Sequence, residues 1–76
     1  MWEKDLRQLK AVLSHNIKTL RKARGLAQER LGLESGVDRT LVSKIERQIA
    51  NPSLEILSKI ASPLQVSVVE LLTKTK

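Results

Sequence analysis

The sequence predicts an all-α fold, a single compact domain of five helices. Apolar residues recur at intervals of three and four along most of the chain, which is the spacing of one helical face, and no segment is expected to form a strand. Hydrophobic residues fill 41% of the 76 positions but include one aromatic, Trp2, so the core must be aliphatic. Because a chain of this length buries only about 60% of its unfolded surface, no roomy substrate pocket is expected.

The longest apolar stripe predicts a first helix from about residue 4 to residue 24. Its aliphatic residues follow at helical spacing and are Leu6, Leu9, Leu13, Ile17 and Leu20. Gly25 comes directly after this segment and is expected to end the helix. The last turn is basic, which suits the negative end of the helix dipole, and contains Arg21, Lys22 and Arg24.

The next two predicted helices are short and are joined by a tight turn. The first spans about Gln28 to Ser35 and stops at Gly36. Asp38 is a natural N-cap for the second, because its carboxylate can accept hydrogen bonds from the first-turn amides, and that helix is expected to reach about residue 49. Two short helices connected through a glycine-containing turn form a helix-turn-helix.

Two further helices are predicted in the carboxyl-terminal third. Ser53 follows a turn-forming Asn-Pro pair and caps a helix over about residues 53–61, which Pro63 is expected to stop. Ser67 and Glu70 have the spacing of a capping box and predict a last helix over about residues 67–73. Residues 1–76 are therefore expected to form one domain.

The charge distribution points to a polyanionic partner. The formal net charge is +6, and basic residues outnumber acidic ones eight to four between Lys18 and Arg47. Such a cluster is an electrostatic footprint for nucleic acid. The chain has no cysteine, no apolar run near the roughly 18 residues of a membrane span, and a charged amino terminus unlike a signal peptide. A cytoplasmic protein without membrane contact is expected.

The segment VDRTLVSKIERQ places its hydrogen-bond donors on one side of the third helix. At about 100° per residue, the aliphatic residues lie opposite a polar arc that contains Arg39, Thr40, Ser43, Lys44 and Arg47. A solvated face usually mixes acids with bases, whereas this arc holds three cations and two hydroxyls. That inventory suits the DNA major groove, where arginine binds guanine and threonine contacts the thymine methyl. A merely solvated face is the alternative.

Five pieces of the sequence, in their order and spacing, resemble a known family. Within the run from Asn16 to Leu72 they are IKTLRKARGLAQERL, SGVDRT, LVSKIER, NPSLEIL and QVSVVELL. Together they are typical of the Cro/C1-type (XRE) helix-turn-helix domain of phage repressors and small bacterial regulators. The resemblance implies a lambda-repressor-like fold and transcription regulation through double-stranded DNA. Within the family, VDRTLVSKIER followed by NPSL is similar to the controller proteins of restriction-modification systems, which are small and dimeric.

The resemblance assigns roles to individual positions. The family positions that reach base edges are occupied here by Arg39, Thr40, Ser43 and Lys44. Phosphate-contacting positions are occupied by Gln28 and Arg47, to which the basic cluster adds Lys22 and Arg24. Arg21 and Glu46 match a pair that forms a structural salt bridge between the first and third helices.

Two departures from the family pattern concern segments that follow helices. Gln48, Ile49 and Ala50 stand where the family commonly has a glycine and a basic residue. A phosphate contact from this loop is therefore in doubt, and Ile49 is expected to cover the core. Gln65 stands where a helix-ending glycine is usual. These departures affect the carboxyl-terminal half more than the DNA-contacting helix.

Specific binding by so small a domain requires two copies. A single half-site recurs often in a genome, whereas a two-fold homodimer on a palindromic operator doubles the contacts and places two recognition helices about 34 Å apart. The apolar residues expected to supply part of this interface are Val66, Val69, Leu71 and Leu72. Closing the core is the alternative role for them.

Other functions have weaker support. A single histidine, His15, without cysteine makes a poor metal site, and no serine has the G-x-S-x-G context of a hydrolase. We therefore expect no enzyme activity, catalytic residue, metal, cofactor or small-molecule ligand. A protein-binding module, for example an antitoxin that uses its helix-turn-helix for autoregulation, is the main alternative, and Met1–His15 would be its candidate surface.

Overall fold

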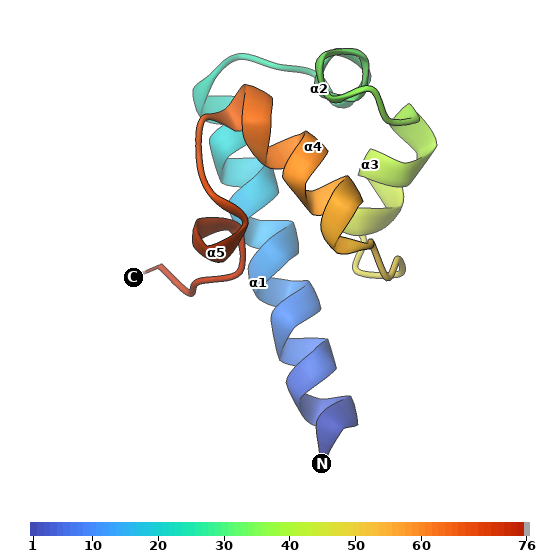
Figure 1. The fold of residues 1–76 in the computed structure, drawn as a ribbon, viewed down its shortest axis with the longest axis vertical. Helices are drawn as coiled ribbons and strands as arrows, with labels where there is room; N and C mark the ends of the chain where they lie inside the picture. Colours follow the sequence, from blue (N-terminus) through green and yellow to red (C-terminus); the bar gives the residue numbers. More distant parts are fainter. Residues whose placement is uncertain (76) are drawn as a thin grey trace.

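The computed structural model describes residues 1–75, and within that range the chain forms five helices and no strand. The helices are α1 (Trp2–Ala23), α2 (Gln28–Ser35), α3 (Arg39–Glu46), α4 (Leu54–Leu64) and α5 (Val68–Leu71). Figure 1 shows that α1 runs along the length of the molecule and that the other four helices gather around its carboxyl-terminal half. The predicted all-α fold with a helix-turn-helix is confirmed.

Four of the helices end with the same hydrogen-bonded turn. After α1, the N–H of Gly25 donates to the Lys22 carbonyl and the N–H of Leu26 donates to the Arg21 carbonyl. Equivalent pairs of bonds close α2, α3 and α4, and the positive-φ residues at the four turns are Gly25, Gly36, Gln48 and Gln65. Glycine adopts a positive φ readily, whereas a side chain makes it costly. The two glutamines are therefore held in a backbone conformation that favours glycine.

The structure corrects two predicted helix ends. Gln48, with φ 65°, ends α3 at Glu46 rather than near residue 49. As a result Ile49 does not cover the core and is 60% exposed. Pro63 does not stop α4 but lies inside its last turn, where its missing N–H removes only one hydrogen bond near the end of the helix.

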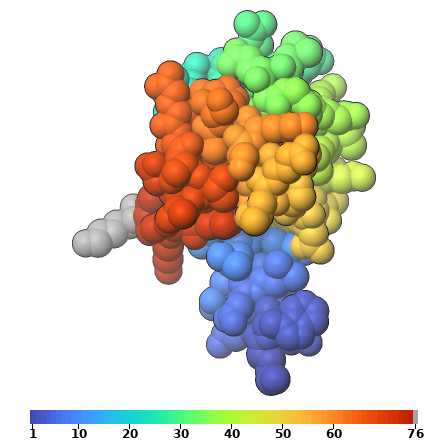
Figure 2. Space-filling model, in the orientation of Figure 1, coloured from blue at the N-terminus to red at the C-terminus, as the bar shows by residue number. Residues whose placement is uncertain are grey.

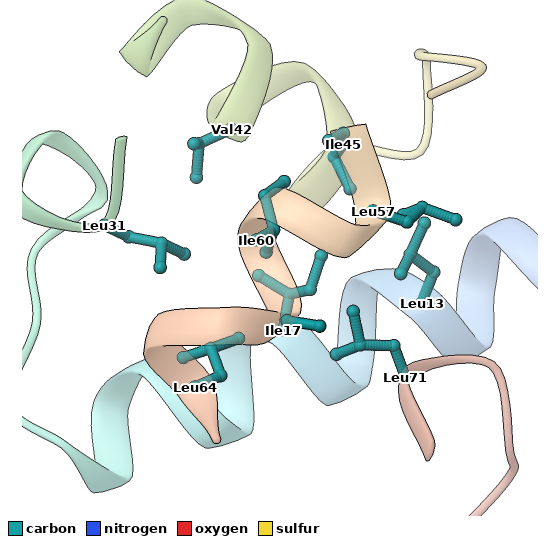
Figure 3. Close-up of a cluster of buried hydrophobic side chains, with 10 residues drawn as sticks. Leu13, Ile17, Leu31, Val42, Ile45, Leu57, Ile60, Leu64 and Leu71 are labelled. Atoms are coloured by element: carbon teal, nitrogen blue, oxygen red, sulfur yellow. The ribbon is translucent and has the colours of Figure 1, made fainter. Parts of the chain in front are cut away.

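The core is aliphatic, and every helix contributes to it. Figure 3 shows the side chains that converge there, among them Leu13, Ile17, Leu31, Val42, Ile45, Leu57, Ile60, Leu64 and Leu71. The buried residues of α1 all lie between Leu13 and Ile17, so the first half of this helix adds no fully buried residue to the core. Figure 2 shows that this first half projects from the rest of the domain.

Candidate nucleic-acid interface

The helix-turn-helix is formed by α2 and α3, and a close backbone contact fixes its turn. The predicted N-cap of α3 is present, because Asp38 Oδ1 accepts from the N–H of Thr40 at 2.8 Å. Gly32 in α2 is buried, and a Cβ added there would lie 2.8 Å from the carbonyl oxygen of Val37. The turn therefore approaches the α2 backbone too closely for a side chain, and this contact sets the position of α3.

The outward face of α3 brings together the predicted base-contacting residues. Three of them are exposed and Ser43 is half-buried; the exposed ones are Arg39, Thr40 and Lys44. The next residue on this face, Arg47, is also exposed. Among residues 1–75, none of the three cations on this face takes part in an ion pair. The opposite face of α3 is packed in the core. The core therefore holds the helix in place while its hydrogen-bond donors face solvent.

Behind this face, α3 is tied to α1 by the predicted salt bridge. The Glu46 carboxylate accepts from Arg21 Nε at 2.7 Å and from Arg21 Nη2 at 3.0 Å. The Glu46 side chain is only 2% exposed. A two-bond arginine–carboxylate contact fixes the relative orientation of its partners more firmly than a single bond does. Arg21 also donates from Nη1 to the carbonyl of Leu26 at 2.8 Å. The Arg21 guanidinium therefore holds the α1–α2 connection as well as Glu46.

Gln28, at the start of α2, belongs to this network as well. Its Nε2 donates to Glu46 Oε1 at 3.1 Å, a contact that the sequence did not predict. An amide nitrogen has two hydrogens, so one donor of Gln28 is left for another acceptor. The N-cap of α2, Ala27, has no side chain to accept from the first-turn N–H groups, and such unpartnered amides favour an anion. A phosphate contact at this helix end remains a prediction.

Lys22 and Arg24 do not lie with the α3 residues. Both are exposed at the carboxyl end of α1, which Figure 1 places on the other side of the molecule from α3. Arg24 Nη2 donates to Gln65 Oε1 at 2.8 Å, so part of its donor capacity is used within the chain. The phosphate contacts of these two residues remain predictions.

The sequence pattern of the HTH_3 family, described as helix-turn-helix, matches residues 17–71. The chain belongs to this family. The matched range contains α2, α3 and the Arg21–Glu46 pair. It is the Cro/C1-type family that the sequence resembles, and its members are DNA-binding transcription regulators rather than enzymes.

Similar proteins agree with membership of this helix-turn-helix family. A hypothetical transcription factor of Neisseria meningitidis is 40% identical over 68 residues, which is 90% of this chain and 64% of the relative, slightly less than two thirds of it. The structure of the restriction-modification controller protein C.AhdI from Aeromonas hydrophila superposes with a TM-score of 0.77 at 37% identity, covering 82% of this chain and 94% of that one. A structure of the biofilm regulator SinR in complex with DNA has a TM-score of 0.76 at 37% identity, covering 80% and 98%.

Two buried polar residues of α1 were not singled out from the sequence. Ser14 Oγ donates to the backbone carbonyl of Glu46, and Asn16 Nδ2 lies 2.9 Å from the carbonyl oxygens of both Leu71 and Thr73. Ser14 therefore anchors the end of α3, and Asn16 anchors the end of α5. Polar residues inside an apolar stripe are the sequence signal that could have identified them, because buried polar groups are nearly always hydrogen-bonded.

The predicted dimer residues around α5 occupy different environments. Leu71 is fully buried, so its assignment to an interface is corrected, because its side chain fills the core of its own chain. Val66 and Leu72 are half-buried and pack against that core. Only Val69, at 73% exposure, is open to a partner.

The side chains that could bind a metal ion do not cluster within residues 1–75. His15 is exposed on α1, and residues 1–75 contain no group of three or more histidine, aspartate or glutamate side chains arranged to hold a metal ion. No helix in this range is sufficiently long and apolar to cross a membrane.

Proposed function

We propose that this helix-turn-helix protein binds a palindromic operator in double-stranded DNA, as a dimer, with α3 in the major groove. The observation that carries the proposal is the outer face of α3, where exposed Arg39, Thr40 and Lys44 accompany Ser43 and no acid of residues 1–75 neutralises the cations. Arginine and lysine donors bind guanine N7 and O6, and the hydroxyls suit several base edges. Likeness to the DNA-bound SinR structure supports the proposal.

The remaining polar groups suit phosphate contacts that set the position of α3 on the duplex. Arg47 extends the cationic face of α3 by one turn, and Gln28 stands at the open amino terminus of α2. Lys22 and Arg24 add positive charge at the end of α1 and would act at the flank of the site. Contacts of this kind position a protein on DNA but carry no sequence information directly.

The finer proposal is a controller of a restriction-modification system. It is supported by likeness to C.AhdI, of which this chain covers 94%. The neighbouring genes separate the alternatives. A methyltransferase and a nuclease beside the gene favour a controller, a toxin favours an antitoxin, and phage genes favour a repressor.

Selection of bound duplexes from a random pool, followed by sequencing, tests the DNA proposal. The salt concentration should be about 150 mM, because phosphate attraction alone holds a cationic protein to any DNA at low ionic strength. We expect enrichment of an inverted repeat with half-site centres about ten base pairs apart, or a multiple of that spacing. A pool that stays random would refute sequence-specific binding.

Two matched substitutions separate base recognition from charge. Arg39→Ala should weaken binding to the selected site by about 1–3 kcal/mol and relax the base preference. Lys22→Ala should leave the preference unchanged and lower the salt dependence by roughly one counterion per protomer. Equal losses on selected and random DNA for both variants would show that α3 does not read the bases.

A further inference from the structure

The projecting half of α1 exposes apolar side chains that the monomer does not cover. Trp2, the only aromatic residue of the chain, is 67% exposed, and Leu9 is 44% exposed. Leu6 on the same side is half-buried. The first two turns of α1 therefore carry an exposed apolar stripe. Exposed apolar surface of this kind is typical of an interaction site.

The stripe has the spacing of a helix-pairing seam and lies beside a groove. Trp2, Leu6, Leu9 and Leu13 are separated by four, three and four residues, which is the spacing of the a and d positions of paired helices. The groove, of about 340 Å³, lies between α1 and the α3–α4 connection and is lined in part by Leu9, Leu13, Leu57 and Leu72. An apolar side chain from another molecule would complete this surface.

Charges next to the stripe are complementary to a second copy of the same segment. Glu3 and Lys10 are seven residues apart and flank the same side of the stripe. Neither takes part in an ion pair within residues 1–75. When two such helices pair antiparallel about a two-fold axis, Glu3 of one copy faces Lys10 of the other. The symmetry produces this attraction twice.

We propose that the amino-terminal half of α1 is the homodimer interface and that it pairs antiparallel with the same segment of a second copy. In this register Leu6 packs against Leu9 of the second copy, and Trp2 lies at the groove of the second copy, which the buried Leu13 helps to line. The inference rests on the dimer of the proposed function and names its surface, which is α1 rather than the exposed Val69 of α5. Figure 1 places this end of α1 opposite α2, so pairing leaves the amino terminus of α2 uncovered.

Trp2 supplies a direct measurement. With no tyrosine or phenylalanine in the chain, fluorescence excited in the aromatic band comes from Trp2 alone. We expect its emission to shift to shorter wavelength as the protein concentration rises, over the same range in which analytical ultracentrifugation shows monomers becoming dimers. A dimer that forms without this shift would place the interface elsewhere and overturn the proposal.

Substitutions at exposed positions test the seam without disturbing the core. Leu9→Ser should weaken dimerisation by at least about tenfold, because each dimer loses two apolar contacts. The controls are Leu33→Ser on α2 and Val69→Ser on α5, which are even more exposed than Leu9, at 70% and 73% against 44%, and should leave the dimer constant within about twofold. A dimer constant that responds to Val69→Ser and not to Leu9→Ser would overturn the proposal in favour of α5.

A charge exchange tests the antiparallel register. Glu3→Lys and Lys10→Glu should each weaken the dimer several-fold, since each places like charges opposite one another twice. The double variant should restore the wild-type constant. Failure of the double variant to recover would refute the register.

Operator selection separates this inference from the proposed function. Enrichment of an inverted repeat by a protein whose dimer ignores the α1 substitutions would reject only the α1 interface. A protein that is monomeric at micromolar concentration, both free and on DNA, would reject the dimer in both proposals.

Discussion

Replacing Arg21 with methionine would leave the Glu46 carboxylate buried without its cation. Within residues 1–75 Arg21 is the only ion-pair partner of Glu46, whose side chain is 2% exposed. Removing one partner of a buried pair costs about 3–5 kcal/mol. At roughly 0.05–0.15 kcal/mol per residue, a domain of 76 residues has about 4–11 kcal/mol in total. Arg21→Met should therefore remove about a quarter or more of the stability.

Urea unfolding followed by far-ultraviolet circular dichroism measures this loss, at one fixed protein concentration because dimerisation stabilises the folded chain. The double variant Arg21→Met/Glu46→Leu should recover at least about 2 kcal/mol, since it leaves no unpaired buried charge. Arg30→Met is the matched control. It breaks the exposed Arg30–Glu34 pair on α2 and should cost no more than about 0.5 kcal/mol.

Two results would refute this reasoning. A loss below about 1 kcal/mol for Arg21→Met, the range of exposed pairs, would mean that water or another group compensates Glu46. A double variant less stable than Arg21→Met would mean that the carboxylate itself stabilises the fold through its contact with Gln28.

Three further substitutions test backbone and burial arguments, each by the urea midpoint. Gly32→Ala should destabilise the domain by about 1–3 kcal/mol and weaken operator binding, because the new methyl carbon would lie only 2.8 Å from the Val37 carbonyl oxygen and would displace the turn; an unchanged midpoint would contradict this. Gln48→Gly should stabilise it by about 0.5–1 kcal/mol by removing the cost of a side chain at positive φ, and a loss would show that the Gln48 side chain contributes contacts of its own. Ser35→Ala should be neutral or stabilising by about 1 kcal/mol, since the buried Ser35 hydroxyl has no partner within residues 1–75. A clear loss there would reveal a hydrogen bond to water.

The sequence predicted those helix limits that depend on local chemistry. The end of α2 follows from Gly36, and the start of α3 follows from the Asp38 cap, because each is decided by residues within one turn. The capping box of Ser67 and Glu70 is likewise present at the start of α5. Such signals require no knowledge of the tertiary structure.

The ends of α3 and α4 were mispredicted for a physical reason. Both helices end at a glutamine with positive φ, a conformation that local preference disfavours and that the packed structure imposes. The hydrogen-bonded turn is the same as those at Gly25 and Gly36. Glutamine, unlike glycine, does not indicate such a turn in the sequence. Because of Pro63, the end of α4 was predicted too early. A proline near the end of a helix removes one backbone hydrogen bond but does not prevent the turn that follows.

The candidate site was predicted in part. The polar arc of α3 follows from helical spacing, and the Arg21–Glu46 pair follows from the family resemblance. The contact of Gln28 with Glu46 joins residues 18 positions apart, and that of Asn16 with Leu71 joins residues 55 positions apart. No periodic pattern specifies contacts of that range, so they required the folded structure.

The small size of α5 has a consequence for the order in which the domain opens. A helix of four residues has no stability of its own, so α5 is held in place by the buried Leu71, by the packing of Val68 and Leu72 against the core, and by the Asn16 amide. Segments held by so few contacts open by local fluctuation before the whole domain unfolds. We therefore expect the amide hydrogens of α5 to exchange with solvent through local opening, and those of the packed α3 helix to exchange more slowly. Such an opening would expose one side of the leucine core, and loss of the Asn16 contact should make it more frequent.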